Sequence, residues 1–129
     1  MNWIWLIASI MILFSGFVHM ILGDRWIFNQ LDASTMNTHY SGEITKITLR
    51  WFWHVGSFII FLNAITVFIM AVTDGILPNE SFMAQFVAII YAGFTVVLIV
   101  VNGQKLSNLR EFPQAILFIV FIILLLWGA

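Results

Sequence analysis

The sequence predicts an all-α integral membrane protein, a polytopic four-helix bundle with up-down-up-down topology and both termini on the non-cytoplasmic side. Hydrophobic residues make up 62% of the 129 residues and charged residues 9%, whereas soluble domains carry roughly 25% charged residues. Four apolar runs approach or reach the ~20 residues that a helix needs to cross the ~30 Å hydrocarbon core. All five Lys and Arg residues lie on or beside two of the connections. Residues 1–129 are therefore expected to form one membrane domain.

The apolar runs set the predicted helices, at about residues 3–22, 46–72, 82–102 and 113–128. The first run lacks the basic segment and small-residue cleavage site of a signal peptide, so we expect it to be retained. Ser41 or Thr45 suits the N-cap of the second helix, and Asn79 or Ser81 that of the third. Pro113 suits the first position of the fourth helix, which is the shortest.

The six tryptophans are predicted at the ends of the helices, because amphipathic indole rings prefer the headgroup level of a bilayer. Three belong to the outer ends and three to the inner ends, namely Trp3, Trp5 and Trp127 outside, and Trp26, Trp51 and Trp53 inside. Residues 25–31, around Trp26, are expected to form one or two helical turns on the inner surface.

The basic residues orient the predicted bundle. Cytoplasmic loops carry the excess of Lys and Arg, and here the first and third connections hold all of them, namely Arg25, Lys46, Arg50, Lys105 and Arg110. Residues 24–45 and 103–112 are therefore expected in the cytoplasm. The predicted setting is a bacterial or archaeal plasma membrane, such as the cell inner membrane. The expected partners are the lipid bilayer and a second membrane protein or further copies of the chain.

Several classes of function are disfavoured. The formal net charge of −1 argues against nucleic-acid binding, which needs a basic surface. The chain contains no cysteine, so it has no disulfide, thiolate ligand or thiol nucleophile. It also lacks the metalloprotease, phosphate-loop and serine-hydrolase motifs. Any metal ion would need histidine, carboxylate or backbone ligands.

Two histidines carry the candidate site. His19 lies about one turn before the inner end of the first helix, and His54 follows the inner start of the second helix by a similar distance. At ~1.5 Å rise per residue the two side chains lie at comparable depth, so antiparallel neighbouring helices could bring their rings face to face. Ser15, Gly16 and Gly23 share a helical face with His19. Small residues allow close backbone approach in lipid, so this face is predicted to pack on the second helix.

Charged and polar neighbours surround this pair. Arg50 and His54 are four residues apart on one face of the second helix, and Asp24 is the nearest carboxylate available to Arg50. We therefore take His19, His54, Arg50 and Asp24 as a candidate ligand or cofactor site, with the two histidines as candidate metal ligands and His39 as a third. Each has a simpler interpretation: a histidine can hydrogen-bond to a neighbouring helix, and an arginine can snorkel to lipid phosphate.

Other polar residues are expected to have structural roles. Asn63 is predicted to hydrogen-bond between helices. Asp74 and Glu80, on the connection between the second and third helices, are expected at the surface.

In size and helix number the chain is similar to the small multidrug resistance transporters. That family depends on a glutamate within its first helix, and here no apolar run contains Asp or Glu. The likeness is one of size, and proton-coupled exchange would have to rest on histidine.

Three functions remain open. The leading one is an accessory or structural subunit of a membrane complex, with a cytoplasmic-side polar site around His19 and His54. The second is a redox or metal-binding protein, because two imidazoles from facing helices can hold a b-type haem or a transition metal. The third is a binder or carrier of a small anionic amphiphile, gripped by Arg50. If both histidines share one ligand, the double substitution should be little worse than either single one.

Overall fold

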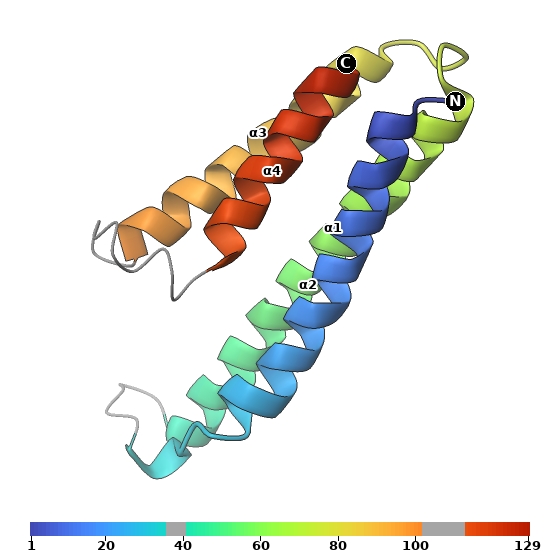
Figure 1. Ribbon diagram of the computed structural model, residues 1–129. Coiled ribbons are helices and arrows are strands. Elements are labelled where there is room, and N and C mark those ends of the chain that lie inside the picture. The colour runs from blue at the N-terminus through green and yellow to red at the C-terminus, as the bar shows by residue number, and fades with distance from the viewer. Residues whose placement is uncertain (36–40, 102–112) are drawn as a thin grey trace. The chain divides into compact units, whose positions relative to one another are not determined.

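The computed structural model describes residues 1–35, 41–101 and 113–129, and the described residues are all-helical without strands (Figure 1). The long helices are α1 (Trp3–Leu22), α2 (Gly42–Thr73), α3 (Glu80–Val101) and α4 (Pro113–Gly128), with a π-helix, η1 (Gly23–Phe28), and a 3-10 helix, η2 (Ala33–Thr35). The predicted helices are confirmed, with α2 beginning four residues earlier than expected. His39, Lys105 and Arg110 lie outside the described residues.

Within the part of the chain that the structure describes, three helical stretches are long and apolar enough to cross a membrane, Trp3–Phe28, Gly42–Thr73 and Glu80–Val100. The chain is therefore a membrane protein by the length and composition of its helices. α4 is also apolar but has 16 residues. At 1.5 Å per residue, the 32 residues of α2 extend about 48 Å, well beyond the ~30 Å hydrocarbon core. Its first nine residues hold Glu43, Lys46 and Arg50, so this excess length accommodates the charges.

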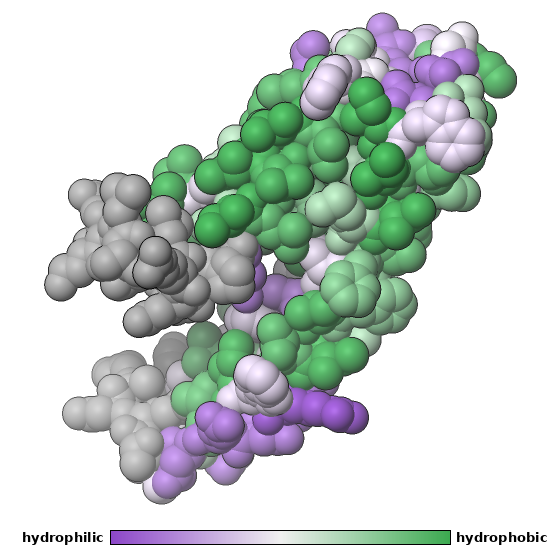
Figure 2. Space-filling view, viewed as in Figure 1, coloured by the Kyte–Doolittle hydropathy of each residue, from purple (hydrophilic) through white to green (hydrophobic). Residues whose placement is uncertain are grey.

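The face in Figure 2 shows hydrophobic side chains over the middle of the helices and hydrophilic ones gathered near helix ends. The chain divides into two compact units. The hairpin unit consists of residues 11–65, and the terminal unit of residues 1–10 and 66–129.

The hairpin unit pairs the second part of α1 with the first part of α2. Ser41 provides the predicted N-cap of α2, since its Oγ accepts a hydrogen bond from the backbone N–H of Ile44 at 3.4 Å. In the connection, the Asp32 carboxylate accepts hydrogen bonds from the Ser34 hydroxyl at 2.8 Å and backbone N–H at 2.9 Å. These bonds lower the pKa of the Asp32 carboxyl, because they favour its charged form.

The terminal unit is built on the packing of α3 against α4. Tyr91 of α3 lies with its ring centroid 5.3 Å from that of Phe118 and 5.2 Å from that of Phe121 of α4. Trp5 also belongs to this core. Its indole N–H donates to the Leu125 carbonyl at 3.2 Å and its side chain is 3% exposed. The depth of Trp5 at the headgroup level stays a prediction, and the structure adds that α4 covers its ring.

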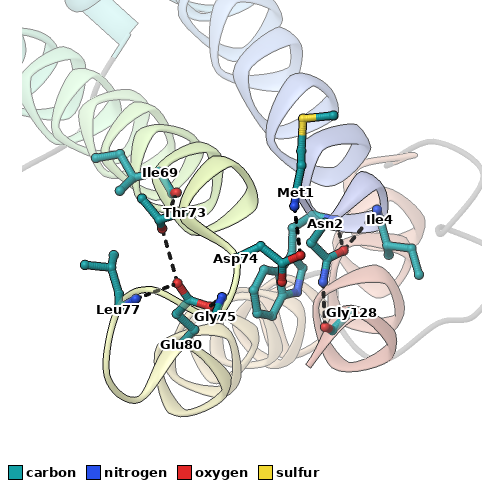
Figure 3. A network of polar contacts seen from close by, with 11 residues as sticks. Met1, Asn2, Ile4, Ile69, Thr73, Asp74, Gly75, Leu77, Glu80 and Gly128 are labelled. Atoms are coloured by element: carbon teal, nitrogen blue, oxygen red, sulfur yellow. Dashed lines mark hydrogen bonds and ion pairs between the residues drawn. The ribbon is translucent and has the colours of Figure 1, made fainter.

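The connection between α2 and α3 corrects one prediction. Glu80 is 8% exposed, and its carboxylate accepts hydrogen bonds from the N–H groups of Gly75 at 2.7 Å and Leu77 at 3.2 Å (Figure 3). The Thr73 hydroxyl lies 3.2 Å from the same carboxylate and 2.7 Å from the Ile69 carbonyl, and these two acceptors share its one proton. Glu80 is therefore a turn-forming residue rather than a surface one. Nearby, Asp74 pairs with the Met1 amino group at 2.9 Å.

Asn2 ties the start of α1 to its neighbours in the terminal unit. Its side-chain oxygen accepts hydrogen bonds from the N–H groups of Ile4 at 3.1 Å and Trp5 at 3.2 Å, as an N-cap residue does. Its amide group donates to the Gly128 carbonyl at 2.9 Å (Figure 3). One side chain thus caps α1 and holds the end of α4 beside it.

Candidate polar site at the junction of α1 and α2

The candidate site begins where α1 changes into the π-helix η1. A π-helix widens the turn, and such turns often occur at functional sites. Here the helix continues through Phe28, which is 4% exposed, and the Phe28 ring packs edge-on against Trp53 with centroids 6.0 Å apart. The turns predicted to lie on the inner surface therefore start as an extension of α1. Asp24, within η1, faces α2.

Gly23 permits this close approach of α1 and α2. A Cβ atom at position 23 would overlap the indole ring of Trp53. About two turns earlier, a Cβ at Gly16 would lie 3.0 Å from the Phe61 ring and 3.2 Å from Ile60. The prediction that this small-residue face packs on the second helix is therefore confirmed.

His19 is held by two residues of α2. Its ring stacks on Trp53 with centroids 4.0 Å apart and an interplanar angle of 4°, and its Nδ1 lies 2.9 Å from the Ser57 hydroxyl. The Trp53 indole N–H donates to the His19 backbone carbonyl at 2.8 Å. Stacking and two hydrogen bonds thus join one turn of α1 to one turn of α2.

The hydrogen bonds of the Ser57 hydroxyl depend on which nitrogen of the His19 ring carries the proton. This hydroxyl also lies 3.2 Å from the Trp53 carbonyl, to which it can donate. A serine hydroxyl has a single proton to donate. When it donates to the Trp53 carbonyl, it accepts from His19 Nδ1–H, and the Nε2 of a neutral ring then carries the lone pair. When the hydroxyl instead donates to His19 Nδ1, the proton of a neutral ring lies on Nε2.

Asp24 holds the second half of the site. Its Oδ1 accepts from Arg50 through Nε and Nη2, each at 2.8 Å, and the His54 Nε2 lies 3.3 Å from the same oxygen. Arg50 and His54 converge on one carboxylate because four residues separate them on a helical face. The predicted pairing of Asp24 with Arg50 is confirmed. With side chains 36% and 54% exposed, this pair contributes about 0–1 kcal/mol to stability.

The two histidines do not meet as ring against ring. The ring that lies against His19 is that of Trp53, while His54 contacts Asp24 on the adjoining flank of α2. Trp53 was therefore missed as a site residue, since it was expected at the headgroup level. The sequence did contain an indication of this role of Trp53. Ser57 follows Trp53 by four residues, so both side chains lie on the face of α2 that meets His19.

The chemistry of this arrangement is that of hydrogen bonding and ion pairing. Among the described residues, no group of three or more His, Asp or Glu side chains could hold a metal ion. His39, the third candidate ligand, lies outside them. Comparisons with protein-family models, curated proteins and solved structures gave no match to this chain.

Proposed function

We propose that this protein is a non-catalytic subunit of a larger membrane complex, whose polar site fixes the geometry of the hairpin between α1 and α2. The observation that carries the proposal is the convergence of Arg50 and His54 on one oxygen of Asp24. The side chains of the site are bonded to other groups of the same hairpin. A catalytic base or acid instead needs an atom within hydrogen-bond reach of a substrate.

The physics of membranes explains why a small subunit would keep such a site. Apolar surfaces gain little by leaving lipid, so helix pairing depends on close packing and polar contacts. Gly16 and Gly23 supply close packing, and His19 and Asp24 supply polar contacts. A hairpin fixed in this way presents a defined apolar surface to neighbouring membrane proteins or to further copies of itself. The end of the hairpin that carries the polar site also carries basic residues, so we place it on the cytoplasmic side.

Mild-detergent extracts of native membranes test this function. Blue-native electrophoresis should find the protein in an assembly much larger than one chain in a micelle. An absorption spectrum and metal analysis of the purified protein should show neither a haem band nor stoichiometric metal. A monomer that carries either group, and loses it in His19→Ala, would contradict the proposal.

One observation favours the alternative of a bis-histidine haem or metal protein. Histidine ligands almost always use their second ring nitrogen to bond a carboxylate, carbonyl or water. Asp24 bonds one nitrogen of His54 and Ser57 one nitrogen of His19, which leaves His54 Nδ1 and His19 Nε2 as the candidate ligand atoms. The same spectrum and metal analysis decide between this alternative and the subunit.

A further inference from the structure

A groove runs along α2 on the flank that carries His54. It is lined by residues spaced three, four and seven positions from the first, namely Trp51, His54, Val55 and Phe58. This spacing places them on one helical face over two turns, about 10 Å of helix length. Trp51 is 71% exposed and Phe58 61%. The groove is therefore apolar along its length and polar at one edge.

The polar edge of this groove carries an exposed guanidinium. Arg50 lies one turn before His54 on the same face, and both side chains share the single carboxylate of Asp24. The exposed Arg25 follows Asp24 in the chain. The Arg50 side chain is 54% exposed, so its guanidinium remains open to a further acceptor. Arg50 donates to Asp24 through Nε and Nη2. The third guanidinium nitrogen, Nη1, can donate to another acceptor.

We propose that this groove binds one anionic phospholipid of the surrounding bilayer. An acyl chain lies along Trp51, Val55 and Phe58, and the phosphate accepts hydrogen bonds from Arg50 at the polar edge. The occupant follows from two features, the position of the groove on a helix long enough to span a membrane and the complementarity of a phosphate to an exposed guanidinium. This inference stands apart from the proposed function, since a lipid can bind with or without a protein partner.

Asp24 makes the proposal testable in two directions. Its carboxylate repels a phosphate and occupies part of the Arg50 guanidinium. Asp24→Asn should therefore strengthen the preference for an anionic lipid, and Arg50→Gln should abolish it. Both substitutions break the same ion pair, so a merely structural effect would move both variants in the same direction.

The experiment uses the full chain in phosphatidylcholine vesicles that contain a minor fraction of brominated phosphatidylglycerol or brominated phosphatidylcholine. Bromine quenches nearby tryptophans, and the difference between the parent and Trp51→Phe isolates the signal of Trp51. We expect the anionic lipid to quench Trp51 at least twofold more than the zwitterionic lipid. Lys46→Gln is the matched control, because it removes a positive charge one turn from Arg50 and should leave the preference intact.

Three outcomes would overturn the proposal. Equal quenching by the two lipids in the parent excludes a headgroup preference. A preference that persists in Arg50→Gln, or that Lys46→Gln removes equally, assigns the effect to general surface charge. A weakened preference in Asp24→Asn shows that the intact ion pair, rather than the guanidinium alone, determines lipid binding. None of these results bears on the subunit proposal, which is tested separately by electrophoresis and cofactor analysis.

Discussion

Gly23→Ala is the most informative single change in the hairpin. The added Cβ would overlap the five-membered ring of the Trp53 indole, which is fixed by its stack on His19 and its hydrogen bond to the His19 carbonyl. The indole can yield only by leaving both contacts. Overpacking of this kind costs about 1–3 kcal/mol. The higher helix propensity of alanine returns up to about 1 kcal/mol. Because the overlap with the ring is severe, the overpacking cost belongs at the upper end of its range, and we expect a net loss of about 2 kcal/mol.

The assay is equilibrium unfolding in mixed micelles with increasing SDS, followed by far-UV circular dichroism and tryptophan fluorescence. Gly93→Ala is the matched control, because a Cβ at position 93 meets no atom within 4 Å, and its stability should stay equal or rise. Gly23→Ala should also change the tryptophan emission of the folded state, since Trp53 loses its stack. Equal stability of the two variants would refute the close contact between Gly23 and Trp53.

Three further predictions follow from the packing and the charges. Gly16→Leu should lower the free energy of unfolding by more than Gly23→Ala does, because the larger side chain meets Phe61 and Ile60. A variant as stable as the parent would mean that this face of α1 contacts lipid instead of α2. Glu80→Gln should lower the free energy of unfolding by about 1–3 kcal/mol, because it weakens charge-assisted hydrogen bonds to the turn before α3. Hydrogen exchange of the Gly75 and Leu77 amides should accelerate. Unchanged exchange would argue against a role of Glu80 in holding this turn. A reporter fused after Ala129 should read external, because the excess of Lys and Arg in cytoplasmic loops predicts that orientation; a cytoplasmic signal would reverse it.

The helices could be predicted from the sequence because hydrocarbon thickness imposes their length. Each apolar run ends where charged or turn-forming residues begin, so α1 matches its predicted bounds of 3–22. The pairing of Asp24 with Arg50 was also predictable. Charges are scarce near the junction, and few alternative partners exist for either residue.

The contacts of Trp53, Trp5 and Glu80 could not be predicted in the same way. An indole ring suits both the headgroup level and a helix interface, and only the register between two helices decides which applies. The periodic small-residue face predicted that α1 approaches α2 near Gly23, but neither η1 nor the identity of the α2 residue that meets Gly23 leaves a periodic signal. Glu80 depends on the turn before α3, where Gly75 and Asn79 adopt positive φ angles of 77° and 65°.

The polar site joins α1 to α2 through two separate sets of contacts. His19 acts through Trp53 and Ser57, and His54 acts through Asp24. The most direct test is a double-mutant cycle of His19→Ala and His54→Ala, with unfolding free energies measured in mixed micelles. Substitutions without shared partners add within about 0.5 kcal/mol, so we expect the effects of His19→Ala and His54→Ala on the unfolding free energy to add. A double variant little worse than either single one would contradict this expectation, because the two rings would then serve one shared ligand.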